Sequence, residues 1–400
     1  MDETILIAGA GQNQISIIRK AKSLGFRTVA VDGFPDAPGL PFADEKVVAD
    51  IRNPEVILAV AENVKATAVY PAAEHAVEAC AHATSRLNLP GVLPEVAHRV
   101  RNKFAMREAL AAREGFNPRY ICVETLQEAR HAAQMIGFPV IVKPVDGNAS
   151  RGVRRVESPG DLNEAFGLAS QVSNKGAVLI ESYLEGEEYN VDGLVFNGRY
   201  IPGAVTGKIR SPLPYRYDEA IFTPGADPEL EDRIFSTVAS ALQCIGFSLG
   251  TTHIEVIVTP KNVYIVEMAG RPGGGRIPSD LIPLAYGMDY LADSLRIAAG
   301  KQPTSKRLFR KGSVLLWLKA KPGIVREIRG VEQAAAVPGV HDIWLQASEG
   351  KTIPRVVDCA TRDKIGYVIA AGNTVDEAFS AAHRAAEKIE IITTAEHVPI

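Results

Sequence analysis

The chain has 400 residues, of which 46% are hydrophobic and 23% are charged, and its formal net charge is −3. This length exceeds one ordinary hydrophobic core, so we expect about two to four domains. The near-neutral charge offers no basic footprint for nucleic acid or an anionic membrane, which leaves small molecules and other copies of the chain as expected partners.

The cysteines and the first residues bear on the compartment. The acidic start, Met1-Asp2-Glu3, lacks the basic residues and the long apolar core of a signal peptide, and no stretch reaches transmembrane length. The cysteines lie far apart and form no CxxC pair, so they indicate neither a disulfide framework nor a zinc site. They are Cys80, Cys122, Cys244 and Cys359. We therefore expect a cytoplasmic protein.

A βαβ unit is predicted at the beginning of the chain. Residues 4–11 form an apolar run that ends in a glycine turn, an amphipathic helix follows up to Leu24, and a second apolar run, 27–31, ends at Asp32. A dinucleotide site of the GxGxxG type would need glycine at position 14, where the chain has Gln14. We therefore favour a turn that is packed for structure or lines a substrate cleft.

The alternation of strands and helices continues from there. We expect a strand at 67–70, a helix at 73–87, and a domain boundary at the proline-rich segment 89–94. A helix is then predicted over 97–113, followed by a short strand near Tyr120 and a helix over 125–136.

A phosphate-binding segment is predicted next. Residues 138–144 form a strand that carries Lys143 near its end, and the small, polar stretch 146–152 follows. Glycines and small side chains let backbone N–H groups approach anionic oxygens, and Lys143 would add a point charge.

Two further segments have features of a nucleotide and substrate site. The strand 177–184 and its continuation 187–192 are joined by Glu185-Gly186, a hinge whose backbone would meet a flat heterocycle while Glu188 takes ribose hydroxyls. The stretch 207–222 mixes proline, tyrosine and basic residues, which predicts an exposed loop. Its candidate anion contacts, with simple solvation as the alternative, are Lys208, Arg210 and Arg216.

A hairpin is predicted from two β-branched runs, 253–258 and 263–268, separated by Thr-Pro-Lys-Asn. If the loop is odd-numbered and centred on Lys261, Glu255 lies opposite Glu267, with Cβ atoms about 5 Å apart. Two carboxylates at that separation suit Mg²⁺; the alternative is that each lies on a solvated strand face.

The residues around this hairpin extend the predicted site. Arg271 follows the second glutamate and would meet an anion, and the run Gly273-Gly274-Gly275 offers backbone to a ligand. His253 shares a strand face with Glu255, so it is either a substrate contact or a packed neighbour.

The tail is predicted to be a separate α+β module. A basic, polar linker spans 300–307. Strands are expected near 314–318, 340–344 and 366–371, and helices near 331–336 and 375–389.

The order and spacing of these motifs resemble the ATP-grasp superfamily of carboxylate–amine ligases. The continuation Gly152-Val153-Arg154-Arg155-Val156 and the ending Glu267-Met268-Ala269-Gly270-Arg271-Pro272-Gly273-Gly274 are most similar to the L-amino-acid ligase branch, which includes dipeptide synthetases. The segments 321–325 and 366–372 resemble that branch's C-terminal domain. The similarity implies a Rossmann-like parallel-sheet domain at 1–95, an ATP-grasp domain at 96–302 with a lid subdomain near 115–185, and an α+β domain at 303–400.

The resemblance also implies a role for each matching residue. Lys103 and Lys143 would contact ATP phosphates, and Ser150 would contact the nucleotide. Glu181 would bind the adenine amino group, Tyr183 and Leu184 would flank the adenine through their backbone, and Glu188 would hold the ribose. Glu255 and Glu267 would bind Mg²⁺, or Mn²⁺ in its place. Arg271, with Lys143, would act in catalysis beside the reacting carboxylate. The implied substrate contacts are His253, Arg271, Gly274, Lys208 and Arg216.

The implied reaction activates a carboxylate as an acyl phosphate and joins it to an amine, releasing ADP and phosphate. The expected partners are a small carboxylate, an amine and a second copy of the chain in a homodimer. Two alternatives remain: the same activation with a carrier-protein thiol or an aminosugar as acceptor, and a nucleotide-binding module without turnover. Relatives often carry asparagine as a further metal ligand where this chain has Ala269.

Overall fold

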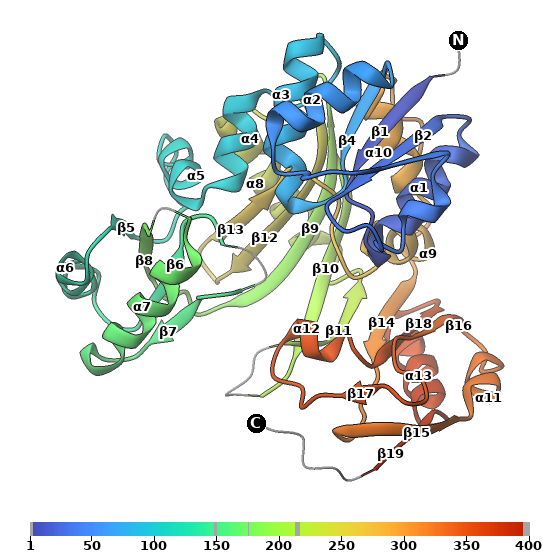
Figure 1. Cartoon of the computed structure of the whole chain (residues 1–400). Helices are drawn as coiled ribbons and strands as arrows, with labels where there is room; N and C mark the ends of the chain where they lie inside the picture. The colour runs from blue at the N-terminus through green and yellow to red at the C-terminus, as the bar shows by residue number, and fades with distance from the viewer. Residues whose placement is uncertain (1–2, 148–149, 175, 213–216, 395–400) are drawn as a thin grey trace. The chain divides into compact units, whose positions relative to one another are not determined.

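The computed structural model describes residues 3–147, 150–174, 176–212 and 217–394. The chain forms two compact units: the first contains residues 1–202, 232–272 and 291–303, and the second contains 203–231, 273–290 and 304–400. Figure 1 follows the chain through both. Within the described residues, no helix is both long enough and apolar enough to cross a bilayer.

The first unit begins with the predicted parallel sheet. Its strands lie in the order β3-β2-β1-β4 and all pair in parallel. The strands are β1 (Thr4–Ala8), β2 (Arg27–Asp32), β3 (Glu45–Val48) and β4 (Ala68–Pro71). The connecting helices are α1 (Ile15–Ser23), α2 (Pro54–Asn63) and α3 (Val77–Leu87).

Alternation along β1 explains why helices cover both faces of this sheet. Ile5 and Ile7 pack in one core with α1 and with α10 (Tyr290–Ala298). Leu6 and Ala8 pack in another core with α2 and α3. A strand buried on both sides is apolar along almost its whole length, as β1 is from Ile5 to Ala8, and this is the usual sequence pattern of a parallel sheet.

The glycine turn after β1 is held by protein groups. The Asp32 carboxylate accepts hydrogen bonds from the backbone N–H groups of Ala10 (2.7 Å) and Phe34 (3.0 Å). Gly9 has a φ of 110°, and a Cβ there would lie 2.7 Å from the Cβ of Ala73. The acidic residue that a dinucleotide site would use for ribose therefore braces the turn.

A small antiparallel sheet follows in the same unit, in the order β5-β8-β6-β7. Figure 1 shows α6 (Leu126–Ile136) and α7 (Leu162–Val172) beside this sheet, and the apolar residues of these helices share one core with β6 and β8. Thr125 begins the first helix with the reciprocal hydrogen bonds of a capping box. The elements are β5 (Tyr120–Val123), α6 (Leu126–Ile136), β6 (Val140–Pro144), β7 (Arg154–Val156), α7 (Leu162–Val172) and β8 (Val178–Ser182).

Three longer strands belong to the first unit, with neighbours in the order β13-β12-β9.

The helix predicted over 97–113 is in fact two helices, because the Asn102 backbone is extended and interrupts it. The elements are α4 (Pro94–Arg101), α5 (Lys103–Leu110), β9 (Glu187–Phe196), α8 (Pro228–Ile245), β12 (Gly250–Val258) and β13 (Val263–Ala269).

The second unit holds the tail and the segment that we expected to be a loop. The expectation of a loop over 207–222 is wrong at both ends, because β10 (Arg199–Arg210) pairs with β11 (Asp218–Thr223) from Gly207↔Phe222 onwards. Lys208 and Arg210 therefore lie on a strand, while Arg216 lies outside the described residues.

The tail combines strands and helices as predicted, with three strands that were not expected. Strands β11, β14, β18 and β16 are neighbours in that order, and β17, β15 and β19 form a small sheet. The strands are β14 (Gly312–Trp317), β15 (Gly323–Arg329), β16 (Val340–Leu345), β17 (Thr352–Ile353), β18 (Gly366–Gly372) and β19 (Glu390–Thr394). The helices are α9 (Ile282–Tyr286), α11 (Val331–Ala335), α12 (Cys359–Arg362) and α13 (Val375–Ala386), the last shorter than expected.

Candidate active site

The start of α5 places the first predicted phosphate ligand. Asn102 caps the helix by accepting a hydrogen bond from the Ala105 N–H (3.0 Å), so Lys103 is the first helical residue. The Lys103 ammonium donates to the Gly147 carbonyl (2.8 Å) and lies 3.1 Å from Glu267 Oε1. A predicted phosphate ligand and a predicted metal ligand therefore lie in contact.

The second predicted lysine lies in a buried cluster. Lys143 on β6 and Glu181 on β8 come from adjacent antiparallel strands, and Lys143 Nζ lies 2.7 Å from Glu181 Oε2. Arg107 on α5 contacts the other oxygen, with Nε 2.7 Å from Glu181 Oε1. All three side chains are buried.

Two cations thus share one buried carboxylate, and the pKa values of Glu181 and Lys143 follow from burial together with these charges. Burial would raise the pKa of Glu181, but the charges and hydrogen bonds of Arg107 and Lys143 outweigh it and lower that pKa to about 2. Burial lowers the pKa of Lys143, and Glu181 compensates only in part because Arg107 opposes it, so the pKa is about 8.

The predicted hairpin forms, and Glu255 on β12 lies opposite Glu267 on β13. The loop between the strands has an even number of residues, because Val258 pairs with Val263, so the condition on which this pairing was predicted, an odd loop centred on Lys261, is not met. A β-bulge supplies the missing residue, since Glu255 pairs with Glu267 while Val256 pairs with Ile265.

The two carboxylates are chemically suited to Mg²⁺, which prefers oxygen ligands and usually keeps several water or phosphate ligands. Among the described residues there is no group of three or more His, Cys, Asp or Glu side chains that could hold a metal. A metal ion held by two glutamates and otherwise by phosphate and water oxygens would not need such a group. Ala269, where relatives often carry asparagine, is buried and pairs with His253.

The hinge residues lie in the first unit beside the small sheet. The Tyr183 N–H donates to the Pro139 carbonyl (3.2 Å), and the Arg155 guanidinium lies 3.9 Å from the Tyr183 ring centroid. Leu184 follows at the end of β8, and Glu188 on β9 pairs with Ile257. Ser150 adopts a φ of 57° within the predicted phosphate loop. The nucleotide roles of these residues stay predictions.

Arg271 belongs to an ion-pair network that the sequence did not reveal. Its Nε lies 2.6 Å from Glu74 Oε2, and Arg101 Nη1 lies 2.8 Å from Glu74 Oε1. Burial would raise the pKa of Glu74, but the charges of Arg271 and Arg101 lower it. Glu74 follows β4, at the carboxyl edge of the parallel sheet where such sheets commonly bind ligands. That position is the signal that could have identified it.

The remaining predicted substrate contacts are divided between the units. His253 Nδ1 lies 3.1 Å from the fully buried carboxylate of Asp192, so this histidine is at least a hydrogen-bonded neighbour of the site. Lys208 and Gly274 belong to the second unit.

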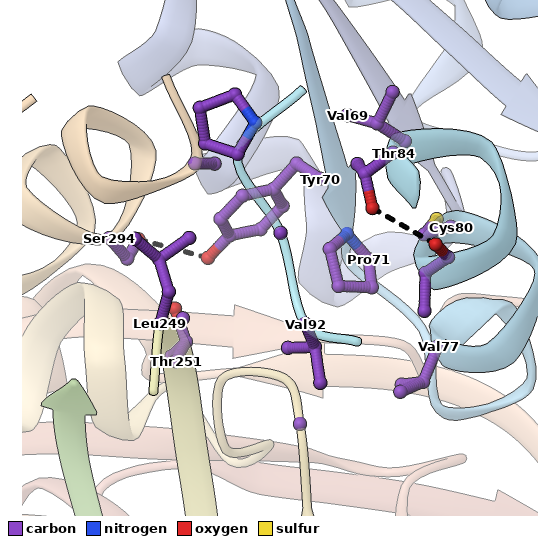
Figure 2. A pocket seen from close by; sticks show the side chains of 16 residues that line it. Val69, Tyr70, Pro71, Val77, Cys80, Thr84, Val92, Leu249, Thr251 and Ser294 are labelled. Atoms are coloured by element: carbon purple, nitrogen blue, oxygen red, sulfur yellow. Dashed lines mark hydrogen bonds between the residues drawn. The ribbon is translucent and has the colours of Figure 1, made fainter. Parts of the chain in front are cut away.

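A small cavity of about 40 Å³ lies in the first unit, lined by none of the predicted site residues. Figure 2 shows the Tyr70 hydroxyl hydrogen-bonded to Ser294 (2.9 Å), while Thr84 and Cys80 line another part of the cavity. Burial raises the pKa of Tyr70 to about 12. The lining of the cavity is mostly apolar and contains no charged side chain, so we assign the cavity to packing rather than chemistry.

Comparison with known protein families adds two matches. Residues 136–280 match the ATP-grasp domain, and residues 316–394 match the L-amino acid ligase C-terminal domain 2. The predicted fold is thus confirmed: an ATP-grasp fold with an N-terminal parallel-sheet domain and a C-terminal domain.

Individual proteins are similar to large parts of the chain. The chain is 30% identical over 308 residues to the uncharacterized protein y4rH of Sinorhizobium fredii, covering 76% of this chain and 63% of that protein. It is 24% identical to the formate-dependent phosphoribosylglycinamide formyltransferase of Bordetella pertussis, covering 97% and 95% of the two chains. The crystal structure of an L-amino acid ligase from Bacillus licheniformis matches with a TM-score of 0.84 at 20% identity, covering 98% and 99%.

Proposed function

Because the chain carries an ATP-grasp domain together with an L-amino acid ligase C-terminal domain, we propose that it is an ATP-dependent carboxylate–amine ligase. The carboxylate would be an amino acid or a related small acid, and the product an amide or peptide. The observation that carries the proposal is that Lys103, Lys143, Glu255 and Glu267 lie in one unit, with Lys103 in contact with Glu267. These are the groups that phosphoryl transfer needs.

The first step would transfer the γ-phosphoryl group to a carboxylate oxygen. A bond forms between that oxygen and the γ-phosphorus, the bond to the β–γ bridging oxygen breaks, and ADP leaves. Lys103 and Lys143 would hold the phosphates in line, and Glu255 and Glu267 would hold Mg²⁺. When bound, the ion would neutralise phosphate charge. Ser150, Glu181, Tyr183, Leu184 and Glu188 would contact the rest of the nucleotide.

The second step would be attack of the amine nitrogen on the carbonyl carbon of the acyl phosphate. The carbon–oxygen bond to phosphate breaks, inorganic phosphate leaves, and the nitrogen loses a proton. Arg271 would stabilise the charge that develops on the acyl group. Glu74, bound to both Arg271 and Arg101, would hold the two guanidinium groups in place and leave one positive charge in excess for the substrate carboxylate.

The proposal also covers the substrate contacts, the domain bounds, the location and the assembly of the protein. His253, Gly274, Lys208 and Arg216 are the proposed substrate contacts, the last outside the described residues. We also propose domain bounds at 1–95, 96–302 and 303–400, a cytoplasmic location, and a homodimer. All four cysteines are free, which supports a reducing compartment.

The test is a phosphate-release screen of amino acids, singly and in pairs, with ATP and Mg²⁺, followed by mass spectrometry of the products. ADP and an amide that form only when both substrates are present would support the ligase. Hydroxylamine would trap an acyl phosphate as a hydroxamate even if the natural acceptor were a thiol or an aminosugar. Nucleotide binding without ADP formation under every condition would indicate the non-catalytic module and contradict the proposal.

A further inference from the structure

Arg107 is the largest fully buried side chain among the described residues. It lies on α5, one turn after Lys103, and neither the expected chemistry nor the sequence motifs assign it a role. A buried guanidinium is costly unless each of its donors is paired. The hydrogen-bond partners of the Arg107 guanidinium therefore indicate its role.

All five N–H donors of Arg107 have a partner. Nε and Nη2 donate to the two oxygens of Glu181, at 2.7 and 3.3 Å. Nη1 donates to the Ile265 carbonyl (2.8 Å) and to Asn117 Oδ1 (3.5 Å). Nη2 also donates to the Val266 carbonyl (3.1 Å). One side chain therefore joins β8 to β13.

The two carbonyls belong to the β-bulge. Glu255 pairs with Glu267 and Val256 with Ile265, so Val266 is the extra residue on β13. A regular ladder continued from Val258↔Val263 would place Glu255 opposite Val266 and turn Glu267 to the other face. The burial pattern agrees, because Ile265 and Met268 are both buried although they are three residues apart.

The other end of the guanidinium fixes the Lys143 cluster. Glu181 is held by Arg107 on one oxygen and contacts Lys143 (2.7 Å) with the other. The position of the Lys143 ammonium therefore depends on Arg107 through a single carboxylate. Lysine at position 107 would lack the planar fork needed to meet a carboxylate and two carbonyls together.

We propose that Arg107 is a positioning residue that couples the two halves of the site, holding Glu181 and Lys143 on one side and the bulge that pairs Glu255 with Glu267 on the other. This inference rests on the proposed function, because it takes Lys143 as a phosphate ligand and the two glutamates as metal ligands. Arg107 itself touches neither substrate nor metal.

The experiment measures ADP affinity by calorimetry, with Mg²⁺ and with EDTA, for the full chain. The decisive quantity is the ratio of the two affinities, which reports the metal contacts without requiring turnover. Arg107→Met should lower this ratio by roughly ten- to a hundred-fold, the usual effect of removing a group that orients metal ligands. It should also weaken ADP binding in EDTA, because Lys143 loses its support.

Two further variants separate this role from a general loss of stability. Glu181→Gln removes the Lys143 arm and leaves the carbonyl contacts, so ADP binding should weaken in EDTA while the Mg²⁺ ratio stays as in the wild type. Arg362→Met removes another buried arginine, one whose Nη1 donates to the Asp218 carbonyl in the second unit, and should change neither quantity. Arg107→Lys, which keeps the charge, replaces Arg107→Met if that protein is insoluble.

The outcomes distinguish this inference from the proposed function. A wild-type ratio in the folded Arg107 variant would overturn the positioning role while leaving the ligase proposal in place. Equal loss in the Arg107 and Arg362 variants would also overturn it, because the effect would then be general. If the wild-type protein bound ADP no better with Mg²⁺ than with EDTA, the metal site and the proposed function would fail together.

Discussion

At the scale of single residues, the site contains two clusters in which positive charges outnumber negative charges. Arg107 and Lys143 share Glu181, and Arg101 and Arg271 share Glu74. In each trio one carboxylate faces two cations, which leaves positive charge for an incoming anion. A phosphate or a substrate carboxylate would supply the missing negative charge in a buried place where such an interaction is strong.

The first prediction concerns pH. Lys143 has a pKa of about 8, so its protonated fraction falls as pH rises through that value, and a neutral lysine binds phosphate less well. We expect kcat/KM for ATP to decline above about pH 8. The acidic limb of the same pH profile should contain no contribution from Glu181, because the pKa of this carboxyl group is about 2. A pH profile of initial rates measures this.

Lys143→Arg is the control for that profile. Arginine stays charged throughout, so the decline near pH 8 should disappear even if overall activity falls. An alkaline limb that is unchanged in this variant would assign the titration to another group.

The second prediction concerns Glu267. Glu267→Gln removes one negative charge and almost no volume, so ligation should be abolished while the fold is retained. Product formation is measured by mass spectrometry and folding by circular dichroism. Wild-type turnover by this variant would remove Glu267 from the metal site.

At the scale of elements, the sequence predicted helices and strands with a clear local pattern better than it predicted how distant segments pair. Period-2 and helical patterns identified the βαβ unit, α6 and the hairpin. They failed over 97–113, where Asn102 interrupts an otherwise helical pattern, and over 207–222, where β10 and β11 pair. The pairing of Glu255 with Glu267 was right, but for the wrong reason, because a bulge rather than an odd loop produces it.

The third prediction tests whether the cap of α5 serves function as well as stability. Asn102 caps α5 and Asn53 caps α2 in the same way, each accepting a hydrogen bond at 3.0 Å from a backbone N–H. Replacing either by alanine should cost about 1 kcal/mol in the free energy of unfolding, measured by urea denaturation. Only Asn102→Ala should also raise the KM for ATP, since Lys103 begins that helix. Equal KM values in the two variants would contradict this.

At the scale of the whole molecule, the site is assembled from residues far apart in the chain. Arg271 and Glu74 are 197 residues apart, and Arg107 and Glu181 are 74 apart. No periodicity connects such positions, so local sequence patterns do not identify Glu74 or Arg107 as site residues. The residues that it did find follow a known order of motifs, so the family resemblance supplied what local patterns could not.

The fourth prediction links nucleotide binding to stability. A ligand that binds only the folded chain raises its stability by about 2.7 kcal/mol at a hundred times the dissociation constant. ADP with Mg²⁺ should therefore raise the thermal unfolding midpoint. With ADP and Mg²⁺ held at the same concentrations, Glu267→Gln should reduce that rise.

Light scattering on the same samples would test the proposed homodimer, because it reports whether the mass is twice the 43.0 kDa of one chain.

The contact between Lys103 and Glu267 has a consequence for the order in which ligands bind. Mg²⁺ arriving alone would have to displace an ammonium group and leave it without that partner. A nucleotide that carries its own metal exchanges partners instead, since phosphate takes the lysine as the ion takes the glutamate. The protein should therefore be nearly indifferent to free Mg²⁺ and responsive to the metal–nucleotide complex, which equilibrium titration of Mg²⁺ with and without ADP would show.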